Sequence, residues 1–405
     1  MSNSILTPTV IAEEALFQLE NNLVFANNVH REYKKEFVKI GDTVSIRKPV
    51  KFTASDGVTR VQQDVVEGNT SITIDKRKHV SWAFSSQDLT LSIEAYSERY
   101  ITPAMIALAN QVDYDVAGLY RYVPNWVGTP GQVIDSFSDF ALLPKRLDKQ
   151  AVPRDMRRAV LSPDDNWGLV GNQTSLYMAE MAQGAYREAS LGRVGGCDTF
   201  MDQNVRSHTT GARGGTPLVN GASQVSTYAS VKSTNTQSLV CDGASNSITG
   251  WAKAGDVFTI ANVYAVNPVS KDTLDYLQQF VVQSDANSDG SGNVTLSISP
   301  AIITSGAYQT VSAAPADNAA LTFVGTAATA YTQSMAFHRN AFALVTVPIE
   351  MPDGATWKAR QTYKGLSVRV VKAYDIDNDE DVIRIDVMYG VKAIYPELAV
   401  RGSGT

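Results

Sequence analysis

The chain has 405 residues, a formal net charge of −6 and a charged fraction of 19%. We expect two or more domains, because one hydrophobic core usually stops growing near ~250–300 residues. The acidic balance argues against a dedicated nucleic-acid binder, which usually carries a clustered basic face. No apolar run approaches the ~20 residues of a membrane span, and Met1–Val10 lacks the features of a signal peptide. We therefore expect synthesis in a cytoplasm, with Cys197 and Cys241 as reduced, small apolar side chains.

The first 84 residues predict a helix followed by a long extended excursion. Apolar residues recur at helical spacing over 9–28. A period of two follows over 43–52 and resumes over 72–84, which indicates antiparallel strands. The middle of this excursion, 55–69, has few residues that build a core, so the arm needs a partner surface to be stable. The alternative is an internal meander that packs on its own domain.

Residues 93–123 carry the clearest helical pattern of the chain. Pro103 lies inside it, so we expect a kink or a fresh start at Thr102–Pro103. Asp113 and Asp115 resemble a catalytic pair, but at i and i+2 they point to different sides of a helix. We interpret both as helix surface.

Residues 125–205 predict mixed helix and strand. A short buried strand is expected at 159–161, a turn at 162–165, and a helix at 175–191 that Gly192 ends.

The composition changes between residues 209 and 332. All thirteen glutamates of the chain lie outside this stretch, which has only four Lys or Arg and seven Asp. Short β-branched runs separated by Gly, Asn, Asp and Ser predict a small antiparallel barrel or sandwich. We interpret the stretch as one domain inserted into another, with strands expected at 238–240, 257–261, 277–282, 294–298 and 321–324.

After Phe337 the composition again resembles that of the chain before residue 209. The sequence predicts strands at 342–347, 365–371, 382–387 and 390–394, with an acidic hairpin tip at 375–381.

Two aspartate-rich turns resemble calcium loops in part. Asp375, Asp377 and Asp379 match the first three ligand positions, but Glu380 stands where the loop needs Gly. Residues 285–290 have the Gly but lack the final bidentate Glu. We interpret both as ordinary hairpin turns, and a weak divalent-ion contact stays open.

Motifs for catalysis and cofactor binding are absent from the sequence. It contains no nucleophile elbow, P-loop or dinucleotide fingerprint. The histidines show no metal-ligand spacing with each other or with cysteine: His30, His79, His208 and His338. We predict no enzyme activity, no cofactor and no metal site.

Two patches carry a family resemblance. The run from Ala185 to Phe200, which leads into the polar insert, resembles coat proteins of tailed bacteriophages, especially those of the Salmonella short-tailed phages. The segment from Met388 to Glu397 is similar to the ending of that group, in which a Tyr-Gly-Val strand is followed by Pro-Glu. The order of the predicted parts agrees as well.

The resemblance implies an α+β protein with the Hong Kong 97-type major capsid fold and an inserted antiparallel β-barrel domain. The implied domains are the N-terminal arm (1–42), the E-loop (43–84), the P domain with its spine helix 93–123 (85–134 and 371–405), the A domain (135–208 and 334–370) and the inserted domain (209–333).

The resemblance also implies a major capsid protein that self-assembles into an icosahedral head shell through a scaffolded procapsid that expands on DNA packaging. The implied partners are further copies in hexamers and pentamers, a scaffolding protein, a portal protein, a decoration protein and packaged double-stranded DNA bound without sequence specificity, with no membrane. The location is the virion, after assembly in the bacterial cytoplasm.

The expected inter-subunit contacts are charged residues of the extended arm and of turns in the insert. They are Arg47, Lys48, Lys51, Arg60, Lys76, Arg77, Lys78, Asp242, Asp285 and Asp289. Three alternatives remain: an encapsulin-like nanocompartment shell, a carbohydrate-binding protein that works through the 209–332 module, and an enzyme of unrecognised type.

Overall fold

The computed structural model describes residues 8–31, 43–54, 57–58, 60, 62–63, 65–85, 100–173, 191–355, 357–363, 366–378 and 380–405. It divides into two compact units. Unit 1 comprises Met1–Val44, Ser71–Ala117 and Phe342–Lys392, and unit 2 comprises Ser45–Thr70, Gly118–Ala341 and Ala393–Thr405. Both units combine helices with largely antiparallel sheets, which confirms the α+β class.

The sheet of unit 1 is built around one long strand, β20 (Glu380–Ala393). On one side β20 pairs with β19 (Leu366–Asp375), which pairs in turn with β18 (Trp357–Tyr363). On the other side it pairs with β3 (Lys76–Ser85), from Tyr389↔Lys76 to Glu380↔Ser85. β17 (Phe342–Thr346) also joins β20. The predicted excursion therefore ends before β3, which pairs along its whole length with β20 of unit 1.

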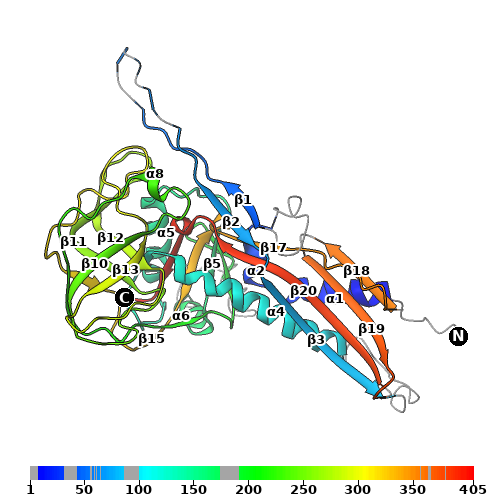
Figure 1. Ribbon diagram of the computed structural model, residues 1–405. Helices are drawn as coiled ribbons and strands as arrows, with labels where there is room; N and C mark the ends of the chain where they lie inside the picture. The colour runs from blue at the N-terminus through cyan, green and yellow to red at the C-terminus, as the bar shows by residue number, and fades with distance from the viewer. Residues whose placement is uncertain are drawn as a thin grey trace. The chain divides into compact units, whose positions relative to one another are not determined.

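The helices of unit 1 are α1 (Pro8–Asn22), α2 (Phe25–Asn28) and α4 (Thr102–Ala117). α1 packs against α4, β18 and β19, and Figure 1 shows α4 beside β3, with which it is in contact. α4 begins at Thr102 directly after the π-helical residues Tyr100 and Ile101, so Pro103 lies next to a change of helix type and not at a fresh helix start. It continues as the 3₁₀ helix η3 (Gly118–Tyr122) of unit 2. The predicted helical residues 93–99 lie outside the described residues.

The interpretation of Asp113 as helix surface is wrong. Its side chain is 1% exposed and accepts hydrogen bonds from the N–H groups of Val24 at 2.6 Å and Ala26 at 2.8 Å. These groups lie where the predicted helix 9–28 is interrupted, at the start of α2. A buried helix N-terminus needs such an acceptor, because its first N–H groups have no partner within the helix.

Unit 2 contains a six-stranded mixed sheet with the order β4-β21-β16-β5-β7-β6. Its core packs under α5 (Phe137–Lys149), whose Phe140, Leu143 and Leu147 are fully buried. The predicted strand 159–161 is confirmed as part of β5. The strands are β4 (Asn125–Val127), β5 (Arg157–Leu161), β6 (Arg193–Val194), β7 (Cys197–Met201), β16 (Ser334–His338) and β21 (Ala399–Gly402).

The predicted turn at 162–165 is instead the start of helix α6 (Pro163–Gln173). The Ser162 hydroxyl accepts a hydrogen bond from the Asp165 N–H at 3.1 Å, so it caps the helix. Pro and Asp favour turns, but they also favour the first turn of a helix, where proline needs no N–H partner and aspartate faces the positive end of the helix dipole. The predicted helix 175–191 lies almost wholly outside the described residues.

Residues 209–332 form a second six-stranded sheet, with the order β14-β11-β12-β13-β10-β9. All five predicted strands are confirmed, four of them as longer strands. A bridge between Leu218 and Ala320 joins the two edges of the sheet, and its core includes Trp251, Phe258 and Phe280. The strands are β9 (Gly215–Val219), β10 (Gln237–Ala244), β11 (Val257–Val266), β12 (Thr273–Val282), β13 (Val294–Ser299) and β14 (Leu321–Phe323).

A short ribbon lies where the chain enters and leaves this sheet. β8 (Ser207–Thr209) pairs with β15 (Ala330–Thr332) in antiparallel register, from Ala330↔Thr209 to Thr332↔Ser207. The two ends of the compositionally distinct stretch therefore meet. A second ribbon, β1 (Thr43–Arg47) with β2 (Asn69–Thr73), lies at the base of the extended arm.

Other predictions concern single features. The acidic tip is confirmed as the turn between β19 and β20, where Asp375 pairs with Glu380. Cys197 and Cys241 are free and buried, and burial raises the pKa of the two thiols to about 11 and about 12. Within the described part of the chain, no helix is long and apolar enough to cross a membrane.

Candidate functional site

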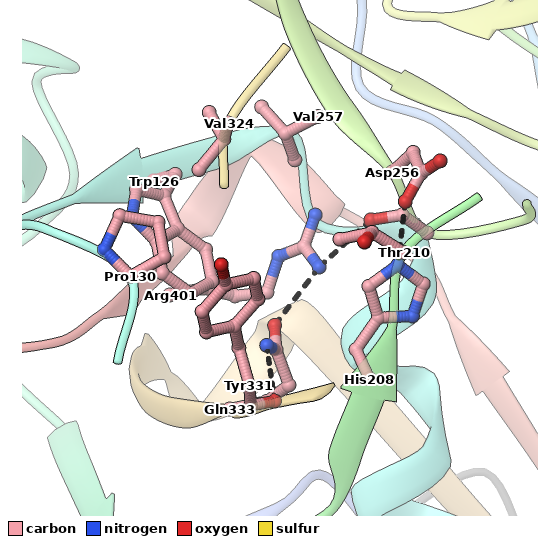
Figure 2. Close-up of a pocket in the computed structure, with 11 residues that line it drawn as sticks. Trp126, Pro130, His208, Thr210, Asp256, Val257, Val324, Tyr331, Gln333 and Arg401 are labelled. Atoms are coloured by element: carbon pink, nitrogen blue, oxygen red, sulfur yellow. Dashed lines mark hydrogen bonds and ion pairs between the residues drawn. The ribbon is translucent and has the colours of Figure 1, made fainter. Parts of the chain in front are cut away.

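A buried polar cluster in unit 2 joins segments that are far apart in sequence (Figure 2). His208 of β8 lies with its Nε2 2.8 Å from Asp256 Oδ1, and its Nδ1 lies 3.0 Å from the Tyr120 hydroxyl of η3. Because an ionised carboxylate only accepts, Nε2 donates to Asp256, and Nδ1 shares the second hydrogen bond with the Tyr120 hydroxyl. The three side chains form one hydrogen-bonded chain.

Asp256 is the acceptor at the centre of this cluster. Its Oδ2 accepts from the N–H groups of Gly211 at 3.0 Å and Lys253 at 3.1 Å, and the Arg213 guanidinium lies 3.9 Å away. Burial by itself raises the pKa of Asp256, but the His208 hydrogen bond, the charge of Arg213 and the two backbone bonds outweigh burial and hold the pKa below its usual value. The ionised carboxylate is therefore stabilised in the interior.

Arg401 of β21 brings a buried cation to the same region. The residue is 1% exposed, and its Nη1 donates to Gly255 O at 3.0 Å and to Gln333 Oε1 at 3.1 Å. Its guanidinium lies 5.7 Å from the ring centres of both Tyr120 and Trp126. Burial lowers the pKa of Arg401 to about 10, so the side chain is charged at neutral pH, and the two rings compensate for lost water.

The cavity beside Arg401 has a volume of about 10 Å³ and is lined by residues that include Trp126, Tyr331 and Gln333. This is about the space of one water molecule. The cluster therefore links side chains from η3, β8 and β21, and this cavity is too small for an organic ligand.

A second contact joins α5 to β12. The Lys149 ammonium lies 2.5 Å from Asp275, and the Arg146 guanidinium lies 3.6 Å from the ring centre of Tyr276.

The Gln279 side chain of β12 pairs with the backbone of Trp126 in β4. It accepts from the Trp126 N–H at 2.8 Å and donates to the Trp126 C=O at 2.9 Å. Because Trp126 lies in the edge strand β4, this amide takes the place of a neighbouring strand.

Three of the predicted contact residues are engaged within unit 1. Lys76 and Lys78 lie 3.1 Å and 4.0 Å from Asp115, and Arg77 lies 3.4 Å from Asp386. Asp386 is fully buried and also binds Arg369 and Arg384. Burial raises the pKa of Asp386, but the Arg369 and Arg384 hydrogen bonds and charges outweigh it and leave the pKa lowered. These ion pairs stabilise the fold of the subunit itself.

The predicted residues of the extended arm take different environments. Arg47 lies 3.5 Å from Glu67 on the opposite strand, at an exposed position. Lys48 donates to Ser233 O at 3.3 Å, and the Lys51 N–H donates to the Tyr308 hydroxyl at 3.0 Å. Arg60 is exposed.

The predicted aspartates of the insert do not converge. Asp285 is exposed and accepts from the Ala254 N–H, and Asp289 closes its own turn by accepting from Ser291 and Asn293. Asp242 is half-buried on β10. The described residues contain no group of three or more His, Cys, Asp or Glu side chains placed to hold a metal ion.

Comparison with known proteins places the chain in a family. Residues 2–403 match the family described as P22 coat protein, gene protein 5. The chain belongs to the P22 coat protein family. The resemblance to tailed-phage coat proteins inferred from two sequence patches is thereby confirmed.

Three proteins that are similar to this chain share 16–27% of its residues in the aligned regions. The major capsid protein of Acyrthosiphon pisum secondary endosymbiont phage 1 is 26% identical over 282 residues, which cover 67% of this chain and 66% of that protein, just under two thirds of its length. A solved chain of Mycobacterium phage Che8 is 16% identical, with 95% and 92% of the two chains covered and a TM-score of 0.49. The CUS-3 coat protein I-domain is 27% identical over 28% of this chain and 98% of its own, with a TM-score of 0.20.

Sequence reasoning missed the buried cluster of this P22 coat protein family member. Arg401 stands alone in a short apolar run near the end of the chain, and Asp256 precedes an apolar strand. One signal was available in the sequence: His208 and Gln333 directly flank the glutamate-free stretch 209–332.

Proposed function

We propose that the chain is the major capsid protein of a tailed double-stranded DNA bacteriophage and that its copies form the icosahedral shell of the head. The observation that carries this proposal is the P22 coat protein family match over residues 2–403. The relative named as a major capsid protein supports it.

The folding pattern supports a Hong Kong 97-type subunit with an inserted domain. We propose that residues 209–333 are an inserted antiparallel β-barrel, because β8 and β15 pair at its ends and the Leu218–Ala320 bridge joins its edge strands. We assign the P domain to unit 1, including the 342–370 strands that the sequence placed in the A domain, because they share one sheet and one unit with α4. The A domain then contains the mixed sheet of unit 2.

We propose that the arm is the main contact to a second copy of the chain. Its apolar side chains are exposed in the subunit, with Phe52 at 63%, Val58 at 106% and Val65 at 62%. Exposed apolar groups on a strand pair without a core are stabilised when another surface covers them. The charged candidates that are exposed, and that we propose for contacts between copies, are Arg47, Lys51, Arg60, Arg77, Asp285 and Asp289.

The wider assembly follows as part of the same proposal. The copies form hexamers and pentamers, assemble with a scaffolding protein and a portal protein in the host cytoplasm, and accept a decoration protein on the outside. The shell expands when double-stranded DNA is packaged without sequence-specific contacts, and the mature location is the virion.

Negative-stain microscopy tests this function. The chain is expressed with and without the scaffolding protein of the same phage, and the fast-sedimenting fraction is imaged. We expect closed shells with the scaffold and irregular shells or tubes without it. Shells that enclose a protein cargo and need no scaffold would favour the nanocompartment alternative.

A further inference from the structure

Among the described residues of the extended arm, two sets of hydrogen bonds join its two strands. Above the β1–β2 ribbon, the Lys48 N–H donates to Gly68 O at 2.8 Å. Further out, the Gln63 side chain accepts from the Thr53 N–H at 3.0 Å and donates to the Thr53 C=O at 2.5 Å. Because an isolated two-stranded ribbon is marginal in water, the direction of this arm needs a support outside the ribbon.

One tyrosine hydroxyl of the 209–332 sheet touches both strands of the arm. The Tyr308 oxygen accepts from the Lys51 N–H at 3.0 Å, and the same hydroxyl donates to Val66 O at 3.5 Å. The Lys51 ammonium lies 6.0 Å from the centre of the Tyr308 ring. Tyr308 therefore bridges the outgoing and the returning strand near the base of the arm.

Tyr308 is itself held in a fixed position. Its ring stacks on Tyr228 with the centres 3.4 Å apart and an angle of 4°. Both rings pack against a small buried cluster of Val231, Ala301 and Ile303. The neighbouring Ala307 carbonyl accepts from the Lys271 ammonium at 2.6 Å. A tyrosine anchored in this way transmits its position to the arm.

The returning strand also comes close to the backbone of the sheet domain. A Cβ atom at Gly68 would lie 2.1 Å from Lys232 O and 3.0 Å from the Tyr228 hydroxyl. Only glycine fits, because a backbone oxygen at that distance cannot give way without moving its segment. The Lys48 ammonium adds a hydrogen bond to Ser233 O at 3.3 Å on the other strand.

We propose that Tyr308 is a positioning residue that fixes the direction of the arm, residues 45–70, within the free subunit. The arm is then set for its contact with a second copy before that copy arrives. The effect of this positioning on the contact between copies rests on the proposed shell function. The positioning of the arm by Tyr308 is a property of the single chain.

Hydrogen exchange of the full-length chain, kept monomeric, tests the positioning. Tyr308→Phe keeps the stacked ring and removes the hydroxyl. We expect the amide exchange of a peptide spanning 48–54 to rise about three- to tenfold, the range expected for one net hydrogen bond. The matched control is Tyr264→Phe, because Tyr264 is an exposed tyrosine of the same sheet. Unchanged exchange in Tyr308→Phe, or an equal rise in the control, overturns the proposal.

A second variant approaches the same contact from the arm. Gly68→Ala should displace the returning strand and raise exchange over 65–68 while leaving the β10–β13 ladder as protected as in the parent chain. Exchange over 65–68 that stays at the parent level would contradict the role of the close contact.

A shell-assembly experiment distinguishes a failure of this inference from a failure of the proposed function. If the parent chain forms shells, we expect Tyr308→Phe to give a larger fraction of malformed particles than Tyr264→Phe. If the parent chain forms no shells, the proposed function fails, while the exchange result still decides whether Tyr308 holds the arm. Shells of parental geometry from a variant with a loosened arm would overturn the consequence for assembly.

Discussion

Replacing Asp256 by alanine is the sharpest test of the buried polar cluster. The carboxylate is 2% exposed and accepts from His208, Gly211 and Lys253, with Arg213 nearby. Its removal leaves the His208 ring nitrogen and two backbone N–H groups in the interior without their acceptor, and it removes the carboxylate that lies 3.9 Å from the Arg213 guanidinium. Removing one partner of a buried charged pair costs about 3–5 kcal/mol.

The expected loss is large enough to measure by thermal unfolding. With about 2–4 °C per kcal/mol for a unit of this size, a loss of about 3–5 kcal/mol should lower the melting transition of unit 2 by roughly 6–20 °C. The control is Asp272→Ala, an exposed aspartate next to β12, which should stay within about 0.5 kcal/mol of the parent. A shift in Asp256→Ala no larger than in the control would refute the reasoning.

The same carboxylate predicts a direction for acid sensitivity. Because the folded pKa of Asp256 is lowered, its contribution is fully present above the unfolded pKa, about 4, and is lost as pH falls below that value. The stability difference between the parent and Asp256→Ala should therefore narrow as the pH falls below about 4. A difference that stays constant over this window would show that the carboxylate acts only by packing.

Three further predictions concern other contacts, each read from urea unfolding. Gln279→Ala should cost about 1–2 kcal/mol, because the backbone of Trp126 loses both partners at the edge of β4; no change would mean that water replaces the amide. Asp386→Ala should destabilise unit 1 by about 3–5 kcal/mol, because the buried Arg369 loses its counter-ion; a neutral result would contradict the burial of this pair. Burial, with a contribution from the charge of Lys51, lowers the pKa of Lys271 to about 8. The unfolded chain therefore binds more protons than the folded chain between about pH 8 and pH 10.5, and the free energy of unfolding should rise with pH in this range. Lys271→Gln should flatten that rise, and an equal slope in both proteins would contradict the prediction.

The strands could be predicted from sequence because their signal is local. In β10 and β13 every second residue is buried against the core, as in Leu239 and Leu296, and this alternation is visible in any window of a few residues. The change of helix type at Thr102 is also a local feature, because it lies next to Pro103.

The polar contacts could not be predicted because their partners are distant. Asp113 is read as helix surface until the N–H groups of Val24 and Ala26, nearly ninety positions away, are placed beside it. Arg401 meets Gly255 across 146 positions. Periodicity describes the face on which a residue lies, but it does not show which distant group will satisfy a buried charge.

The charged residues at the start of β3 show the same limit, because their partners within the unit are also distant in sequence. Lys76, Arg77 and Lys78 form a basic run that suggested contacts with another subunit. The ten-residue pairing of β3 with β20 brings them to Asp115 and Asp386 of their own unit. The sequence of a charged run does not show whether its partners lie in the same subunit or in another one.

Sedimentation velocity of the purified full-length chain, alone and with its scaffolding protein, tests the central claim most directly. The account predicts a subunit species that converts into a discrete, fast-sedimenting particle when the scaffold is added. A chain that remains a monomer or a small closed oligomer under every assembly condition would contradict it.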